Sequence, residues 1–467
     1  METSQKQGLN ISVRSFITAI VVIFCLMIAA YVLTLTIPGG AYARIEDASG
    51  NLILDTGAEF VFVDGGIPFY KWLLSPILVL GASGSGTIIA VIAFLLVIGG
   101  VFNALDKCGL MAYILNKTAS RFSAVRYRLM AIIVLFFMSL GSLIGSFEEC
   151  VPMVPLAVVL AVNLGWDRLT GVGMSLLAAG CGFAAGVCNP FTVGVAQQLA
   201  GLPMFSGLWL RALSFVLIYG LLLMFLRWYA KSIEKPLMAM QADIHYTPDK
   251  AMDRGMICFV AIMGLGITIV LSSALIPALQ DYTMIIVSVM FLAAGIVSVL
   301  ACGHTAKALG RDFWDGLTSI FPAVLMILMA SSIKYTLEEA HVLDTILHAA
   351  VDLAKTLPGW TVILFIYLTI LGMNFFIPSG SAKAFMLIPL IVPMAQIFGI
   401  SPQLCVVAFA FGDGFSNVFY PTNPALLIAL GLADVNYADW FKWSGKFQVV
   451  NLALTSLILL FALPLGY

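Results

Sequence analysis

Two long stretches of this chain repeat each other at a constant spacing. The first runs from Pro155 to Pro190 and the second from Pro389 to Pro424, an offset of 234 residues (389 − 155) in a chain of 467. Each stretch ends in Asn-Pro, which interrupts a helix because proline removes a backbone donor. Two apolar halves with interruptions at corresponding positions are typical of transporters whose substrate site lies between the repeats.

The composition requires a lipid environment. Hydrophobic residues make up 61% of the chain and charged residues 10%, against averages of about 45–50% and 25% in soluble proteins. The net charge of −1 argues against a nucleic-acid partner. The sequence contains no HExxH, no GxSxG and no spaced Cys/His cluster, so we predict neither an enzyme nor a bound cofactor.

Apolar runs of roughly 20 residues predict membrane-spanning helices. We place nine of them near residues 15–37, 84–105, 167–200, 207–229, 255–278, 282–302, 316–334, 402–433 and 440–466. Two further apolar stretches, 124–166 and 359–400, carry a polar patch with glycine or proline in the middle. Each is either two spans or one re-entrant hairpin that enters and leaves on the same side.

The distribution of charge favours the hairpins. Basic residues cluster in 227–254 and 307–311 and acidic residues in 46–64, and Lys and Arg favour the cytoplasmic side. With two hairpins the N-terminus lies inside and the repeats are inverted. We therefore predict an all-α polytopic membrane protein with two inverted repeats, each with a re-entrant helical hairpin and a broken transmembrane helix. The amphipathic segments 110–122 and 337–357 predict in-plane helices, with ordinary connecting loops as the alternative.

The chemistry should lie where the helices are interrupted. An unsatisfied N–H or C=O group in lipid costs several kcal/mol, so a break is tolerated only where it lines a cavity. Asn189 and Thr192 at the first break, and Thr422 and Asn423 at the second, supply oxygens for Na⁺ or a substrate. The alternative is a packing kink in which asparagine caps the free carbonyls.

The centres of the two hairpins form the second element of the site. We call residues 142–146 tip 1 and residues 379–381 tip 2. Both offer free N–H groups and hydroxyls with little bulk, and helix N-termini that point inward there would favour an anionic group such as a carboxylate. Small residues for close helix packing are the alternative.

Four ionisable groups lie beside these elements: Glu148, Glu149, Lys383 and Asp413. Charges in a bilayer are costly and usually functional. Fully ionised, the four groups sum to −2, which protons, Na⁺ or a cationic substrate would balance. Glu149 and Lys383 are partners under the 234-residue offset, so an ion pair between them is the alternative to a substrate role. Asp413, which lies between two glycines, is also a candidate backbone cap.

The candidate substrate site combines these tips, breaks and ionisable groups. Its predicted residues are Ser142, Gly145, Ser146, Glu148, Glu149, Asn189, Thr192, Ser379, Gly380, Ser381, Lys383, Asp413, Asn417, Thr422 and Asn423. A Na⁺ ion would lie near Ser146, Asn189, Ser381, Thr422 and Asn423, because these residues carry side-chain oxygens. Na⁺ or H⁺ is the expected coupling ion.

Several of these motifs resemble the YfcC-type carriers, which are related to the anaerobic four-carbon dicarboxylate carriers of the ion transporter superfamily. The resemblance rests on Gly145-Ser146-Phe147-Glu148-Glu149, Asn189-Pro190-Phe191, Pro378-Ser379-Gly380-Ser381 and Pro421-Thr422-Asn423-Pro424, and covers most of the chain from about Gly84 onward. It implies a scaffold domain, a transport domain with both hairpins and both broken helices, in-plane arms, a homodimer and an elevator movement. Lys383 departs from the pattern, because this tip position is apolar in relatives.

The resemblance also implies a division of the chain into domains. Residues 1–123 would hold scaffold helices and the first arm, and 124–230 the first half of the transport domain. Residues 231–254 would form a cytoplasmic linker, 255–358 further scaffold helices and the second arm, and 359–467 the second half of the transport domain.

We predict a secondary active transporter, either a symporter or an antiporter, in a bacterial inner membrane. Its substrate would be a small carboxylate-bearing metabolite, and the carboxylates at the site favour a basic amino acid. Lys383 is the main argument for the alternative, a four-carbon dicarboxylate. An ion channel is the alternative of another class, but apolar residues close both ends of the polar region, which favours alternating access. The predicted partners are the substrate, the lipid bilayer and a second copy of the chain.

Overall fold

The computed structural model describes residues 13–46, 52–54, 59–82, 85–114, 117, 125–145, 147–203, 205–234, 248–273 and 283–467. Within this part of the chain, eight helical segments are long and apolar enough to cross a membrane by length and composition. They are Ile88–Lys107, Arg126–Leu143, Arg168–Ala185, Leu208–Ile233, Ala306–Glu339, Gly359–Phe376, Gly380–Ile397 and Tyr437–Leu465. Because both helices of the second predicted hairpin satisfy this criterion, length alone leaves the choice between hairpin and two spans open.

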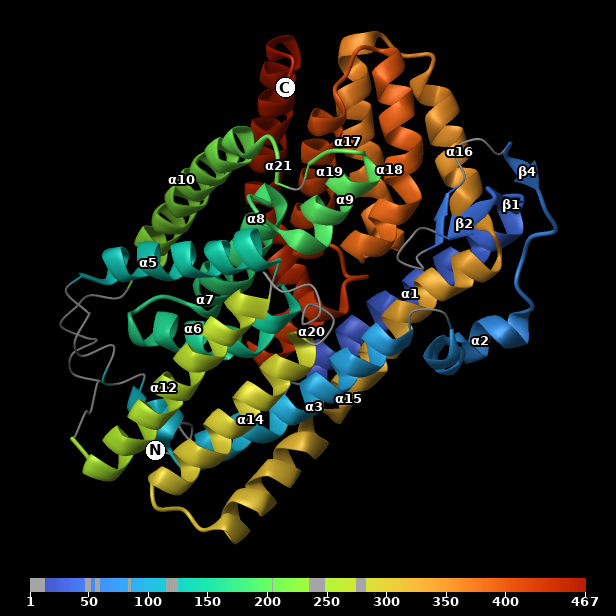
Figure 1. The fold of residues 1–467 in the computed structure, drawn as a ribbon. Helices are drawn as coiled ribbons and strands as arrows, with labels where there is room; N and C mark the ends of the chain where they lie inside the picture. The colour runs from blue at the N-terminus through green and yellow to red at the C-terminus, as the bar shows by residue number, and fades with distance from the viewer. Residues whose placement is uncertain are drawn as a thin grey trace.

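One group of helices packs together in the lower half of Figure 1. It consists of α1 (Val13–Thr36), α2 (Phe69–Leu78), α3 (Ser85–Lys107), α12 (Lys250–Ser273), α14 (Thr283–Ala301) and α15 (Ala306–Glu339). The long helix α15 contacts α1, α2 and α3, and α14 contacts both α3 and α12. Helix α16 (Val342–Ala354) follows α15 and leads to the second group.

The second group contains both halves of the sequence repeat. In the first half, α5 (Arg126–Ser139) continues as a π-helical turn over Leu140–Ile144. The chain then turns at Gly145, which has a positive φ of 80°, and returns through a 3₁₀ turn over Glu148–Met153 and α6 (Val154–Asn163). In the second half, α17 (Gly359–Phe376) and α18 (Gly380–Ile397) are joined by three residues around Pro378.

Each half then contains an interrupted helix. In the first, α7 (Arg168–Val172), a π-helical turn and α8 (Ala178–Ala185) form one segment that ends at Gly186, whose φ is 51°. A π-helical turn over Pro190–Gly194 leads to α9 (Val195–Leu199). In the second half, α19 (Pro402–Asn417) stops six residues before α20 (Pro424–Leu432) begins. Helices α10 (Leu208–Ile233) and α21 (Tyr437–Ala462) follow the two interrupted helices.

The two interrupted helices touch through equivalent residues. A Cβ atom added to Gly180 of α8 would overlap the side chain of Val418, and one added to Gly414 of α19 would overlap Ala184. Gly180 and Gly414 are partners under the 234-residue offset, and so are Ala184 and Val418. The contact between the halves is therefore reciprocal, as in the interface of a two-fold dimer.

The expectation of an all-α chain is wrong for the segment between α1 and α2. Strand β1 (Gly40–Ala41) pairs with β4 (Val61–Phe62), and β2 (Arg44–Glu46) pairs with β3 (Leu52–Leu54), in both cases antiparallel. This segment has short apolar runs between glycines and charges, too short to span a membrane. Pairing the strands satisfies backbone groups that would otherwise lack partners.

The in-plane helices are described only in part. Helix α16 occupies most of the second predicted arm. Its Asp344 accepts a hydrogen bond from the N–H of Tyr42 at 3.1 Å and forms an ion pair with Arg44 at 2.9 Å. Much of the first arm, 110–122, lies outside the described residues.

Candidate functional site

A buried ion pair lies at the centre of the second half. The Nζ atom of Lys383 is 2.6 Å from Oδ1 of Asp413, and both side chains have no exposed surface. The same ammonium donates hydrogen bonds to the carbonyl oxygen of Ile377 at 3.1 Å and to Oδ1 of Asn374. Lys383 therefore has three acceptors, one of them a full negative charge, and its own charge is neutralised within the protein.

An asparagine network connects this pair to the second break. The Nδ2 group of Asn374 lies within hydrogen-bond distance of the backbone oxygen of Asp413 (3.1 Å), Oγ of Ser416 (2.6 Å) and Oδ1 of Asn417 (3.0 Å). Asn417 also accepts from Nδ2 of Asn423 at 3.0 Å. Oδ1 of Asn423 in turn caps α20 by accepting from Ala425 N at 2.9 Å. Asn423 thus caps an N–H group of α20 and, among the described residues, no free carbonyl, which differs from the capping considered as the alternative.

The first break meets tip 2 beside Asp413. A Cβ atom added to Gly380 would overlap the methyl group of Thr192 and lie 2.7 Å from Oδ2 of Asp413. Thr192 Oγ1, Asp413 Oδ2 and Thr422 Oγ1 are buried and have no hydrogen-bond partner among the described residues. Three acceptor oxygens, drawn from both halves of the chain, therefore remain available to a ligand or ion.

Tip 1 holds the backbone of the first break. Ser142 is fully buried, and its Oγ and backbone oxygen accept hydrogen bonds from the N–H groups of Val187 and Cys188, both at 3.0 Å. Asn189 Oδ1 accepts from the N–H of Thr192 at 3.3 Å. Glu148 is half-buried and lies within electrostatic range of Asp413, which brings tip 1 and α19 to the same region.

The remaining predicted residues are placed less completely. Ser379 and Ser381 are half-buried at the start of α18, and the Ser379 side chain makes no capping hydrogen bond. Ser146 and the side chain of Glu149 lie outside what the structure describes.

The ion pair considered between Glu149 and Lys383 stays a prediction, because the Glu149 side chain lies outside the described residues. Lys383 binds Asp413, which follows it by 30 residues on a helix that packs against α18. Asp413 caps no backbone group among the described residues, because its Oδ1 accepts from the ammonium and its Oδ2 has no hydrogen-bond partner there. The 234-residue offset relates equivalent positions of two halves, and equivalent positions need not be neighbours.

Three residues of this region were not predicted as site residues: Asn374, Ser416 and Arg211. Asn374 and Ser416 connect the ion pair to the second break. Arg211 is fully buried on α10 and donates from Nε to the carbonyl oxygen of Val187 at 3.3 Å. Its presence inside a predicted span was the available signal, because an ionisable residue there is a functional candidate by default.

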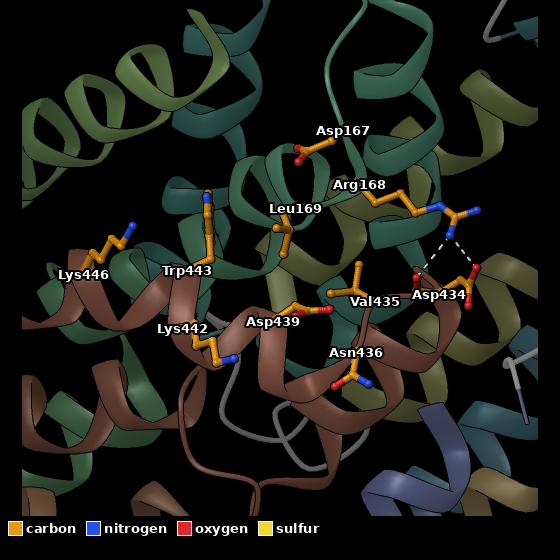
Figure 2. A pocket seen from close by; sticks show the side chains of 10 residues that line it. All are labelled: Asp167, Arg168, Leu169, Asp434, Val435, Asn436, Asp439, Lys442, Trp443 and Lys446. Carbon is orange, nitrogen blue, oxygen red and sulfur yellow. Dashed lines mark hydrogen bonds and ion pairs between the residues drawn. The ribbon is translucent and has the colours of Figure 1, made fainter. Parts of the chain in front are cut away.

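A separate cavity of about 510 Å³ opens between the start of α7 and the link from α20 to α21 (Figure 2). Arg168 forms an ion pair with Asp434 across it, joining the two halves. None of the predicted site residues lines this cavity, and its three basic side chains are balanced by three acidic ones: Arg168, Lys442 and Lys446 against Asp167, Asp434 and Asp439. It is distinct from the buried cluster.

An apolar helical bundle with a polar cluster buried between interrupted helices defines a multi-pass membrane transport protein. The chain belongs to the DcuC family, described as C4-dicarboxylate anaerobic carriers, whose sequence profile matches residues 16–464. The resemblance to YfcC-type carriers is thereby confirmed, as is the prediction of a carrier and not an enzyme.

Two bacterial relatives are similar over most of their length. YfcC of Escherichia coli K12, whose name assigns it provisionally as a basic amino acid antiporter, is 30% identical over 415 residues, 82% of this chain and 80% of its own. An uncharacterized protein of Haemophilus influenzae is 27% identical over 382 residues, 77% of this chain and 72% of its own.

Two solved structures also align with the chain. The YdaH transporter of Alcanivorax borkumensis has a TM-score of 0.43 at 16% identity and covers 97% of this chain and 99% of its own. MtrF of Neisseria gonorrhoeae, from a class of antimetabolite efflux pumps, has the same TM-score and identity and covers 96% and 94%. At these scores neither similarity bears on the function of this chain.

Proposed function

We propose that the chain is a secondary active transporter of the bacterial inner membrane that carries a basic amino acid. The observation that carries this proposal is the neutralisation of Lys383 by Asp413. Lys383 is the one cation among the predicted site residues, and an ammonium with three protein acceptors has little capacity left for a dicarboxylate. Glu148 and the unpartnered Oδ2 of Asp413 remain near the same point, which favours a cationic substrate group.

The second candidate is a four-carbon dicarboxylate carrier. The family's description favours it, whereas the name of the E. coli relative favours a basic amino acid. A dicarboxylate has two anionic ends and would need two sets of donors. The hydroxyls of Thr192 and Thr422 could donate to one carboxylate, but the adjacent Asp413 carboxylate would repel it, so a dicarboxylate would require a bound cation beside it.

We propose Na⁺ or H⁺, or exchange of substrates, as the source of coupling. Oxygen atoms of Ser146, Asn189, Ser381, Thr422 and Asn423 are the proposed Na⁺ ligands, since hydroxyl and amide oxygens at a helix break suit Na⁺. The buried Oγ1 of Thr422, which has no hydrogen-bond partner in the described chain, supports this choice.

We propose that the two halves are inverted repeats and that transport uses an elevator movement within a homodimer. The reciprocal contact between α8 and α19 supports a two-fold relation between the halves. The packing of α1, α3, α12, α14 and α15 as one group supports the proposed division into scaffold residues 1–123 and 255–358 and transport residues 124–230 and 359–467, with 231–254 as the linker. The proposed N-terminus is cytoplasmic.

The decisive experiment is thermal stabilisation of the purified protein by candidate substrates. L-Arginine, L-ornithine and L-lysine are compared with succinate and fumarate, each with and without Na⁺ and at two pH values. A ligand that binds only the folded state at a hundredfold excess over Kd adds about 2.7 kcal/mol of stability. We expect a shift with the basic amino acids; a shift with succinate alone, dependent on Na⁺, would establish the second candidate instead. D-Arginine serves as the control for specific recognition.

A further inference from the structure

A second fully buried cation lies beside the first break and, unlike Lys383, has no anionic partner among the described residues. Arg211 on α10 is 0% exposed. Its Nε donates to the carbonyl oxygen of Val187 at 3.3 Å, while Nη1 and Nη2 have no hydrogen-bond partner in the part of the chain that the structure describes. Within the described part of the chain, the titratable side chains close enough to influence it are the thiol of Cys188 and the phenol of Tyr467, both neutral at pH 7.

An unpaired guanidinium in such a place is costly. Arginine does not lose its proton in proteins, and a buried ion carries a desolvation penalty of several kcal/mol unless it is paired. Another buried arginine of this chain follows the usual rule: Arg126 donates to Glu234 at 2.7 Å and to the carbonyl oxygen of Leu164 at 3.2 Å. The four unused N–H groups of the two Nη atoms of Arg211 would therefore be stabilised by a bound anion.

Capping the end of a broken helix does not explain the charge. In the second half, the carbonyl groups that follow α19, those of Val418 and Phe419, accept from Trp440 Nε1 at 2.9 Å and from the hydroxyl of Tyr437 at 3.0 Å. These neutral donors come from α21, as Arg211 comes from α10. Neutral side chains thus satisfy the backbone carbonyl groups at the second break. A neutral donor would suffice at the first break too, so the carbonyl group there does not account for the positive charge of Arg211.

Arg211 is also placed next to the candidate site. The residue that it contacts, Val187, donates its own N–H to Ser142 of tip 1 at 3.0 Å. Two residues further along the chain is Asn189, whose side chain holds the N–H of Thr192. The guanidinium therefore adjoins the same break that carries the unpartnered Thr192 hydroxyl.

We propose that Arg211 binds the carboxylate of the transported substrate through its two Nη groups. A guanidinium and a carboxylate form two parallel hydrogen bonds, which matches the pair of unused nitrogens. This inference rests on the proposed function and extends it: a basic amino acid would place its carboxylate at Arg211 and its cationic end toward Glu148 and Asp413.

The test compares Arg211→Gln and Arg211→Lys with wild type, and Arg227→Gln on the exposed far end of the same helix is the control. The probes are L-arginine, agmatine (the same molecule without its carboxylate) and succinate, with melting temperature as the readout. We expect wild type to prefer L-arginine to agmatine. Arg211→Gln should lose at least about 30-fold in L-arginine affinity and leave agmatine binding unchanged, with Arg211→Lys in between.

The ligand-free protein separates a binding role from a structural one. Because Arg211 has no anionic partner among the described residues, Arg211→Gln should melt no lower than wild type without ligand. A lower melting temperature with unchanged L-arginine affinity would overturn the proposal, and so would wild type that binds agmatine as tightly as L-arginine, although transport of a basic solute would then stand. If wild type binds only succinate, the amino acid proposal fails. Arg211 then keeps its role as the carboxylate ligand only if Arg211→Gln no longer binds succinate. If the melting temperature of wild type changes with neither L-arginine nor succinate, both the amino acid proposal and the role of Arg211 are refuted.

Discussion

The ion pair between Lys383 and Asp413 allows a quantitative prediction. Lys383→Met leaves Asp413 as an uncompensated carboxylate with no exposed surface and also removes the donor from Asn374 Oδ1 and Ile377 O. Breaking a buried pair by removing one partner typically costs about 3–5 kcal/mol, and each orphaned buried acceptor adds about 1–3 kcal/mol. Because the neighbours can relax and readmit water, we expect a loss near the upper end of the range of about 3–5 kcal/mol.

The double variant Lys383→Met/Asp413→Asn should recover most of this loss. Replacing both members of a buried pair by neutral groups of similar volume is often close to neutral, so the double variant should be more stable than the Lys383→Met variant. The assay is equilibrium unfolding in detergent for wild type, both single variants and the double variant. A Lys383→Met variant as stable as wild type, or a double variant less stable than either single one, would refute the reasoning. A stable double variant that loses succinate binding present in wild type would instead make Lys383 a substrate contact.

Three further predictions concern other parts of the molecule. Gly380→Ala places a methyl group against Thr192 and should cost about 1–3 kcal/mol through overpacking and lower the transport rate, whereas Gly220→Ala, with open space around it, should leave both unchanged. Arg168→Ala removes a half-exposed ion pair and should lower the free energy of unfolding by less than about 1 kcal/mol, an effect that added salt should diminish. Burial, with smaller effects of Asp352 and Asp344, raises the pKa of Tyr42 to about 12, so its stabilising contribution should be complete below the ordinary tyrosine pKa of about 10 and be lost as the pH rises from about 10 to 12. The difference in tyrosinate absorbance between wild type and Tyr42→Phe measures that pKa.

Each of these predictions has an outcome that contradicts it. Equal transport by the two glycine variants would mean that the contact between tip 2 and the first break is not part of the site. If Arg168→Ala lowered the free energy of unfolding by several kcal/mol, the ion pair across the cavity of Figure 2 would stabilise the contact between the two halves more than an exposed pair does. Ionisation of Tyr42 near its ordinary pKa of about 10 would place its hydroxyl in water.

The sequence predicted those features that local chemistry determines. Proline removes a backbone donor and asparagine readily caps a helix start, so the two Asn-Pro pairs located the breaks at Asn189 and Asn423. The glycines that let α8 approach α19 also belong to the repeat itself. The partner of Lys383 could not be found in this way, because the choice between Glu149 and Asp413 depends on how α18 packs against α19. The strands before α2 were missed because runs of two or three residues have no recognisable period.

Arg211 was missed for a different reason. It lies close to the start of an apolar span, where a long basic side chain commonly reaches the water at the membrane surface. Only the packing of α10 against the first break reveals that this arginine is fully enclosed. Whether a charged side chain is buried depends on tertiary packing, which the hydropathy along the chain does not report.

The reciprocal contact between Gly180 and Val418 and between Gly414 and Ala184 also bears on the origin of the chain. A half-length ancestor could have made the same contact with a second copy of itself, each copy supplying both the glycine and its partner. Fusion of the two genes would then have freed the copies to diverge. One half satisfies its break with tryptophan and tyrosine and the other with arginine, so the two breaks, alike in sequence, differ in charge.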